Sequence, residues 1–194
     1  LVGNLYIIGS GDPTLGSWRW QETTEKSFGK KMLAALQGKN ISKINGDIII
    51  DTRKWESQVT LRGWIWEDIG NYYGAGASAL SWHENQYDLM LKPGKNAGDP
   101  VGIAGTDPVV EGIRFVNELK TGKEGSGDNS VIYLPETGSI AYVRGTVPAG
   151  KETFRVAGAV PDAPGAGRGR RDGRPRPLPP HATSPLSTTW KPSL

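Results

Sequence analysis

The chain has 194 residues, including 27 glycines and 14 prolines but no cysteine. The missing thiols exclude disulfide bonds, thiolate zinc sites and a cysteine nucleophile. The formal net charge is +3, and because residues 157–194 carry +4, the rest of the chain is close to neutral. A folded nucleic-acid-binding domain concentrates basic residues on one face, so residues 1–156 do not favour that class.

The predicted elements begin with a strand at residues 5–8 and one helix within residues 22–39. In the helix, Phe28, Met32 and Leu36 recur every four residues on one face, and Gly38 stands where a helix-terminating glycine belongs. Apolar or alternating runs separated by Gly and Pro then predict strands at residues 47–51, 58–66, 87–92, 112–119, 130–134, 139–147 and 152–160. Short strands with such turns favour a mainly β fold, an antiparallel sandwich or barrel with one short helix.

The composition changes near residue 157. The segment beyond it consists largely of Pro, Gly, Arg, Ser and Thr. Such a segment buries too little apolar surface to offset the entropy lost on ordering. We therefore divide the chain into a β-rich globular domain, residues 1–156, and a disordered, low-complexity tail, residues 157–194.

Two short motifs match known interaction signals. LPETG, residues 134–138, matches the sortase motif but lacks the apolar segment that a sorting signal needs behind it. RPLPP, residues 176–180, matches the start of an SH3-domain ligand but lacks its last proline. We interpret the first as a turn between strands and the second as tail sequence.

Tryptophans are the main candidates for a binding site, because six of the seven lie in residues 1–156. In the predicted strand at residues 58–66, Val59, Leu61 and Ile65 alternate with Trp64 and Trp66. The two indoles would therefore point away from an aliphatic, core-facing side. Exposed aromatic rings bind flat ligands and partner proteins. The predicted ligand-binding residues are Trp18, Trp20, Trp64, Trp66, Tyr72, Tyr73 and Trp82.

Catalytic and metal-ligating groups are sparse. His83 is one of only two histidines, and the sequence contains no G-x-S-x-G nucleophile motif and no set of ligands at metal-site spacing. Glu67, Asp68 and Glu84 are carboxylates of the kind that a glycosidase uses in pairs, but their spacing selects no pair. We predict no catalytic residue, no metal and no cofactor, and leave open whether the chain is an enzyme.

Two segments resemble starch-binding carbohydrate modules. Leu5–Trp18 combines a strand ending in glycine with the sequence L-G-x-W, and Gly145–Val156 contains a strand–PAG–strand turn. The resemblance implies an antiparallel β-sandwich that binds α-glucans through tryptophans without catalysis. It also implies that Trp18 occupies the position of the loop tryptophan of such modules.

The leading hypothesis is a non-catalytic, surface-displayed domain that recognises a glycan, or a protein partner, through exposed tryptophans. An alternative is a viral capsid, spike or filament protein that self-assembles into a homo-oligomer. Its basic tail would then neutralise nucleic acid through phosphate contacts, the one route to a nucleic-acid partner. A third hypothesis is a carbohydrate-active enzyme that uses Glu67, Asp68 or Glu84.

The location follows from what the sequence lacks. No apolar run approaches the roughly 20 residues of a membrane-spanning helix. No signal peptide is evident, and the chain starts with Leu rather than Met. We expect a processed product or fragment without a membrane span, located outside the cell, on a cell surface or on a virion.

Overall fold

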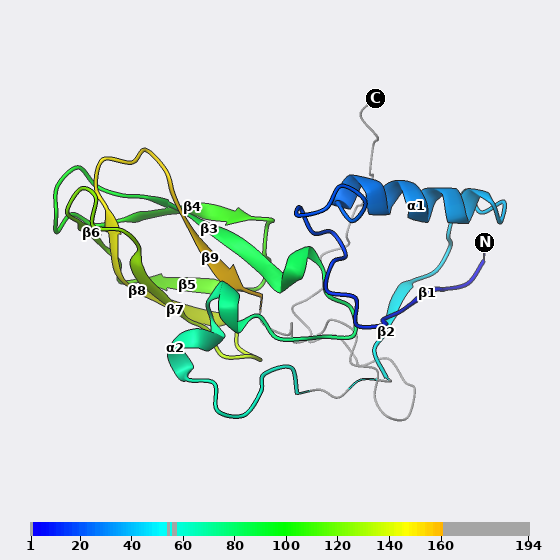
Figure 1. Cartoon of the computed structure of the whole chain (residues 1–194). Coiled ribbons are helices and arrows are strands. Elements are labelled where there is room, and N and C mark those ends of the chain that lie inside the picture. The colour runs from blue at the N-terminus through cyan, green and yellow to red at the C-terminus, as the bar shows by residue number, and fades with distance from the viewer. Residues whose placement is uncertain (1, 54, 56–57, 161–194) are drawn as a thin grey trace.

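The structure is a computed structural model that describes residues 2–53, 55 and 58–160. Figure 1 shows two parts at opposite ends. One, the N-terminal unit, consists of β1 (Leu5–Ile8), α1 (Glu25–Gln37) and β2 (Ile48–Asp51). The other, the sheet body, contains β3 (Gln86–Lys92), β4 (Gly102–Asp107), β5 (Arg114–Asn117), β6 (Lys120–Gly122), β7 (Asn129–Tyr133), β8 (Ile140–Pro148) and β9 (Phe154–Ala159). In chain order, α2 (Trp66–Ile69) and two 3-10 turns, Tyr72–Gly74 and His83–Asn85, come between the two parts.

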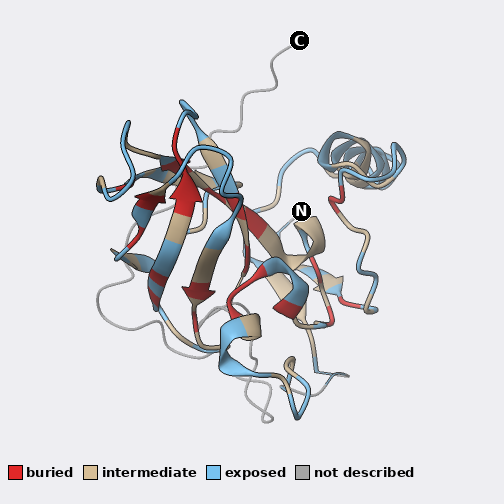
Figure 2. Cartoon of the chain, turned by 60° about the vertical axis from the view of Figure 1, so that its left-hand side comes forward, coloured by how far each residue is buried: buried red, intermediate tan, exposed pale blue. Residues whose placement is uncertain are grey.

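The N-terminal unit is a strand–helix–strand arrangement with a parallel pair. β1 and β2 pair from Leu5 opposite Ile48 to Ile8 opposite Asp51. The side chain of Thr24 caps α1 by accepting a hydrogen bond from the backbone N–H of Ser27. None of the α1 residues is buried, and Figure 2 shows the helix mostly in the colour of exposed residues.

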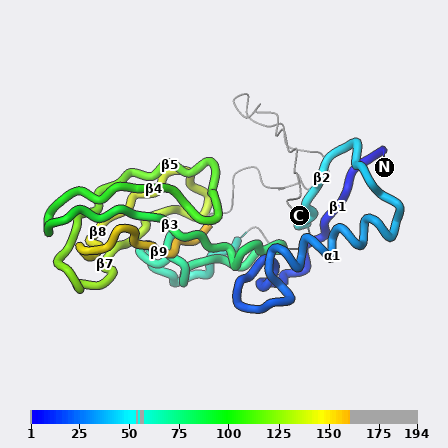
Figure 3. Tube along the Cα trace, turned by 90° about the horizontal axis from the view of Figure 1, so that it is seen from above, coloured from blue at the N-terminus to red at the C-terminus, as the bar shows by residue number. Residues whose placement is uncertain are grey.

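The sheet body holds the core. One sheet has the antiparallel order β4-β3-β9, and in the other β8 pairs with β7 on one side and with β5 and β6 on the other. Figure 3 shows these strands gathered at one end of the chain trace. The buried side chains of the two sheets form one apolar cluster, made of Tyr87, Leu89, Leu91, Val101, Leu119, Ile132, Leu134, Ala141, Val143, Val147 and Val156.

The mainly β class and the predicted helix are confirmed, but the strand pairing is mixed. β1–β2, β5–β8 and β6–β8 are parallel, and the strands of residues 2–53, 55 and 58–160 form no closed sheet. Two short strands, β4 and β6, were not predicted, because Gly and Thr in both runs hide the apolar alternation. β9 runs to Ala159, so a strand continues past residue 156, and the predicted tail from residue 161 onward lies outside the described residues.

The prediction of a strand at residues 58–66 is wrong. These residues form an irregular connection that leads into α2. Leu61 and Ile65, predicted to face the core, are 68% and 57% exposed. Gly63 adopts a φ of +90°, which interrupts an extended run and shows why the two-residue alternation did not become a strand. The predicted indole-bearing face therefore does not exist.

Candidate functional site

Among the described residues, an exposed aromatic cluster with a nearby carboxylate lies on α2 and the turn after it. We call it the α2 site and define it as Trp66, Asp68, Tyr72 and Tyr73. The rings of Tyr72 and Tyr73 meet edge to face at 5.1 Å, and both side chains are at least half exposed. Trp66 is also exposed, and its ring centroid lies 6.5 Å from that of Tyr133 on β7.

Close backbone contacts hold the α2 site against the sheet body. Asn71 is buried, and its side chain bridges two segments, because it donates to the carbonyl of Glu67 and accepts from the N–H of Ile132 at 3.2 Å. The carbonyl of Gly70 accepts from the N–H of Ala159 at 3.0 Å. A Cβ at Gly70 would lie 2.0 Å from the carbonyl oxygen of Ile132, so only glycine fits there.

The electrostatics of the α2 site favour cationic or amide-bearing ligands. Partial burial, followed by the negative charge of Asp68, raises the pKa of Tyr73. Tyr73 therefore keeps its proton at neutral pH and can donate a hydrogen bond. A carboxylate beside exposed aromatic faces attracts ammonium groups through charge and cation–π contacts. The site contains no nucleophile paired with a base.

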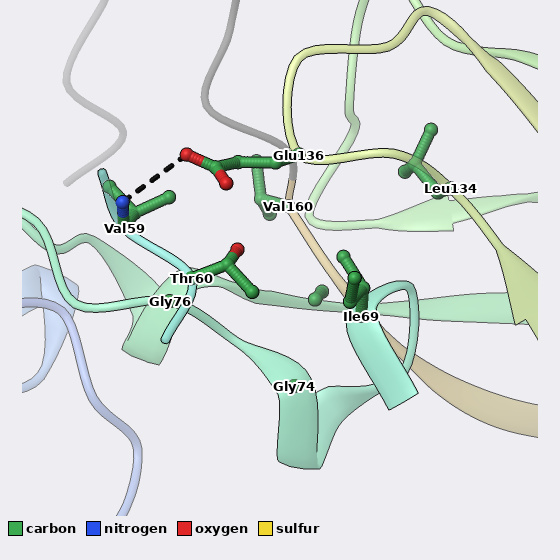
Figure 4. A pocket seen from close by; sticks show the side chains of 9 residues that line it. Val59, Thr60, Ile69, Gly74, Gly76, Leu134, Glu136 and Val160 are labelled. Carbon is green, nitrogen blue, oxygen red and sulfur yellow. Dashed lines mark hydrogen bonds between the residues drawn. The ribbon is translucent and has the colours of Figure 1, made fainter. Parts of the chain in front are cut away.

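A small pocket lies between the connection before α2, residues 58–66, and the sheet body (Figure 4). Its volume is about 20 Å³, and Ile69, Gly74 and Leu134 are among its lining residues. Glu136 reaches across and accepts a hydrogen bond from the N–H of Val59 at 3.2 Å. A space of this size holds about one water molecule. The pocket is therefore too small for a substrate. The hydrogen bond of Glu136 across it holds the connection before α2 against the sheet body. The pocket also buries Leu134 of the LPETG sequence, which is 2% exposed.

A second cluster joins the N-terminal loop to the sheet body, and we call it the junction. His83, Glu84 and Asn85 have φ values of 53°, 55° and 53°. Left-handed backbone costs roughly 1–2 kcal/mol per non-glycine residue, so other contacts must hold this turn. The hydroxyl of Ser17 donates to Glu84 at 2.6 Å, and the guanidinium of Arg19 donates to both oxygens of the same carboxylate at 2.8 and 3.0 Å.

The contacts of the junction stabilise the fold. Burial pushes the pKa of Glu84 upward, but the hydrogen bonds from Arg19 and Ser17 and the charge of Arg19 outweigh it, so the pKa lies below its ordinary value. A carboxylate held ionised in this way is a weak base. Ser17 has no exposed surface, and its hydroxyl donates a hydrogen bond to that carboxylate. The three residues therefore act as a clamp rather than as a nucleophile and its base.

The structure separates the predicted ligand-binding residues into two groups. Trp66, Tyr72 and Tyr73 belong to the α2 site, with Trp64 half-buried just before it. Trp18 and Trp82 belong to the junction, where Trp18 stacks at 4.6 Å on His83 and Trp82 meets Phe28 at 5.5 Å. Trp20, 46% exposed, follows Trp18 in the same loop. The acidic candidates Asp68 and Glu84 also separate, one to each cluster.

Comparison with known proteins decides the family. Residues 1–166 match the family model of the D-Ala-D-Ala carboxypeptidase 3 (S13) family. The chain belongs to this family.

Individual relatives agree with the family match. D-alanyl-D-alanine carboxypeptidase DacB of Haemophilus influenzae is 33% identical over 103 residues, which are 53% of this chain and 20% of the relative. D-alanyl-D-alanine carboxypeptidase of Actinomadura sp. strain R39 is 28% identical over 156 residues, which are 76% of this chain and 27% of the relative. The chain thus spans about a fifth to a quarter of the curated relatives that it matches.

A solved structure supports the fold. The crystal structure of penicillin binding protein 4 (dacB) from Haemophilus influenzae superposes with a TM-score of 0.57 at 23% identity. The match covers 82% of this chain and 33% of that chain.

The family match corrects the functional predictions made from the sequence. The prediction of a starch-binding module was wrong. The family model extends over both segments that carried the resemblance, Leu5–Trp18 and Gly145–Val156. A glycan-binding domain, a viral capsid, spike or filament protein and a carbohydrate-active enzyme are overturned by the same finding. The resemblance rested on two sequences, L-G-x-W and PAG, that are too short to identify a family. The ligand-binding residues remain a prediction, and the structure divides their rings between the junction and the α2 site.

The solved neighbour is titled a penicillin binding protein, and proteins of that class use the motifs S-x-x-K, S-D-N and K-T-G. The sequence contains S-x-x-K at Ser27–Lys30 and K-T-G at Lys120–Gly122, which the sequence analysis missed, but no S-D-N. Ser27 lies in the first turn of α1, where its hydroxyl donates to the carbonyl of Gln21 at 2.7 Å. Lys120–Gly122 forms β6 at the opposite end of the molecule (Figure 1). The two motifs therefore do not form an active site within residues 2–160.

The described residues contain neither a membrane-spanning helix nor a metal-ligand cluster. No helix in residues 2–53, 55 and 58–160 has the length and apolar content for crossing a bilayer. Within the same residues, no three side chains of the His, Cys, Asp or Glu type gather as a metal site would require.

Proposed function

We propose that this chain is part of a D-alanyl-D-alanine carboxypeptidase, an enzyme that hydrolyses the bond between two terminal D-alanines of a peptide. The family match over residues 1–166 carries this proposal. The chain spans a fifth to a quarter of its curated relatives, and the hydroxyl of Ser27 donates to the carbonyl of Gln21 at the start of α1. We therefore place the serine nucleophile in a part of the polypeptide outside the described residues.

Within that enzyme, the α2 site is proposed to contact the peptide substrate. Its backbone is fastened to β7 and β9 through Asn71 and Gly70, so its side chains are presented from a rigid base. Asp68 supplies a negative charge, and Tyr72 and Tyr73 supply exposed aromatic faces. A peptide offers matching groups, since amide N–H and ammonium groups bind carboxylates and apolar side chains pack on rings.

Two finer features belong to the same proposal. The two sheets of the body act as the two layers of a sandwich that carries α2 on its edge. The enzyme works outside the cytoplasm, as the sequence predicted, in the cell envelope where a peptide-trimming enzyme of this family finds its substrate.

The test measures D-alanine release from a peptide ending in D-Ala-D-Ala, using the longer polypeptide that carries this chain. We expect release, and we expect Asp68→Asn and Tyr73→Ala each to raise KM by about tenfold, equivalent to about 1.4 kcal/mol of lost binding, with little change in kcat. Tyr142→Ala on β8 is the matched control, since this exposed ring lies outside the α2 site. Absence of release would overturn the enzyme assignment, whereas an unchanged KM would overturn only the role of the α2 site.

A further inference from the structure

Basic residues gather in one stretch of the N-terminal unit. Residues 25–46, which are α1 and the chain that leads from it towards β2, contain five lysines and a single acidic residue, Glu25. The rest of residues 1–156 contains 17 acidic and 12 basic residues. α1 and the sheet body lie at opposite ends of the molecule (Figure 1). The helix end is therefore positively charged, whereas the remainder of residues 1–156 is negatively charged.

Four of these lysines are exposed and are not compensated by a carboxylate. They are Lys26, Lys30, Lys31 and Lys39, and we call them the α1 lysines. Lys31 donates to the backbone carbonyl of Glu22 at 3.0 Å, which is a neutral acceptor. Within residues 2–53, 55 and 58–160, no ion pair joins an α1 lysine to an acidic side chain. The positive charges of the α1 lysines are therefore available to a partner outside the chain.

Most arginines of the described residues are neutralised locally instead. Four of the six pair with a carboxylate, namely Arg19, Arg53, Arg144 and Arg155. A surface that only keeps a protein soluble intersperses both signs of charge. Clusters of roughly four to eight basic residues on one helix are typical of proteins that bind anionic lipid headgroups. The α1 lysines have this character, and the arginines of the described residues do not.

Trp20 places an indole beside the N-terminal end of α1. Its side chain is 46% exposed. The carbonyl of Trp20 accepts hydrogen bonds from the N–H and the hydroxyl of Thr23 at 3.2 and 3.1 Å, and this turn leads directly into the Thr24 cap of α1. Tryptophan is enriched at membrane–water interfaces, where its ring lies at the level of the headgroups. The indole therefore extends the basic surface with a group that suits a lipid headgroup layer.

We propose that the α1 lysines and Trp20 form a docking face for a membrane surface that contains anionic lipids. The ammonium groups lie against the lipid phosphates, and the indole enters the headgroup layer. Lys26 and Lys30 are four residues apart and share a face of α1, whereas Phe28 is two positions from each and faces away from them. The contact therefore uses the lysine-bearing side of the helix and not its apolar series.

This inference goes beyond the proposed function, because it concerns where the chain is held and not which bond is hydrolysed. Charge alone would also attract a soluble polyanion. The choice of a membrane rests on Trp20 and on the proposed location in the cell envelope, where a membrane is an extended anionic surface.

The experiment measures sedimentation of the 194-residue chain with two kinds of vesicle, one of phosphatidylcholine alone and one of phosphatidylcholine and phosphatidylglycerol in equal parts. We expect the chain to sediment with the anionic vesicles only, and the binding to weaken as salt screens the charges. The combined variant Lys26→Gln, Lys30→Gln and Lys39→Gln should lower the partition coefficient by about fivefold per lysine, or roughly 100-fold in all. Trp20→Ala should cause a smaller loss.

The matched control replaces three exposed lysines in loops of the sheet body, by Lys95→Gln, Lys123→Gln and Lys151→Gln. It removes the same charge, leaves residues 157–194 unchanged and should retain most of the binding. Circular dichroism should show both variants folded, because all six positions are exposed.

Equal losses in the two combined variants would reveal a general effect of net charge and would overturn the proposal. Equal sedimentation with the neutral vesicles, or an α1 variant that binds as the original chain does, would also overturn it. Binding to soluble polyphosphate without sedimentation on anionic vesicles would assign the α1 lysines to a soluble polyanion and exclude the membrane. None of these readouts uses D-alanine release, so the proposed function stands or falls separately.

Discussion

The apolar pattern of the sequence predicts elements at both ends of this molecule, but the two ends differ in how tightly these elements are packed. Leu89 and Val143 in the sheet body have no exposed surface, whereas no residue of α1 is buried. Both ends carry apolar residues at the period of their secondary structure. Periodicity in the sequence therefore identifies an element and the face that it buries. It does not show whether the element that packs on this face lies within the same stretch of chain.

The largest expected difference between the ends concerns leucine truncation. Leu89→Ala in β3 should lower the free energy of unfolding by about 2–5 kcal/mol, because it opens a cavity in a closed core. Leu33→Ala on α1 should change it by less than about 0.5 kcal/mol, as exposed substitutions usually do. Urea unfolding of the 194-residue chain measures both. Equal losses would mean that α1 is packed as tightly as the core.

The next effect tests how the α2 site is fastened to the sheet body. Asn71→Ala removes the bridge between Glu67 and Ile132 and should cost about 1–3 kcal/mol, because buried polar partners are left unsatisfied. Asn129→Ala, at an exposed position on β7, is the control and should be close to neutral. Thermal unfolding with Trp fluorescence measures the change. A neutral Asn71→Ala would show that α2 is held by other contacts.

A smaller effect concerns the clamp between the two ends. Glu84 has a lowered pKa in the folded chain, so it adds stability above the pKa that it has when unfolded, and this stability is lost as the pH falls through the folded-state value. Glu84→Gln should cost about 1 kcal/mol at pH 7, discounted because Arg19 is half exposed. In this variant the free energy of unfolding should also fall less steeply as the pH drops below 4.5, the ordinary pKa of Glu. Urea titrations at pH 3–7 measure both effects, and an unchanged pH profile would contradict the clamp.

The smallest expected effect lies on the outer face of the sheet body. The guanidinium of Arg144 donates to Glu118 at 2.6 Å and lies over the rings of Tyr133 and Tyr142. Because Arg144 and Glu118 are both about half exposed, water and salt screen their attraction, and Arg144→Ala should lower the melting temperature only slightly. Thermal unfolding at low and high salt checks this, and a large fall in the melting temperature would show that this face is covered in solution.

Much of the fold was accessible from the sequence, and the exceptions have physical causes. The helix ending at Gly38 and most strands of the body followed from apolar spacing and glycine turns. Residues 58–66 show the correct alternation, but Gly63 turns the chain and the aliphatic side chains remain in water. Spacing along the chain also gave no signal for β6, whose stability comes from pairing with β8.

The site was less accessible, because its determinants are distant in sequence. Trp66, Tyr72 and Tyr73 were selected for their aromatic character alone. The residues that position them, Gly70 and Asn71, act through contacts with Ile132 and Ala159 that no local pattern reveals. The tripeptide K-T-G and the S-x-x-K at Ser27 were visible in the sequence, but only the structure shows that they lie apart.

The proposed carboxypeptidase activity requires a serine nucleophile outside the described residues. The most direct measurement is covalent labelling with a fluorescent penicillin, followed by mass spectrometric mapping of the modified residue, since the serine of such enzymes is a nucleophile. We predict an adduct in the longer polypeptide that is unaffected by Ser27→Ala and maps outside residues 2–53, 55 and 58–160. An adduct at Ser27, or at any other of these described residues, would contradict the proposed function.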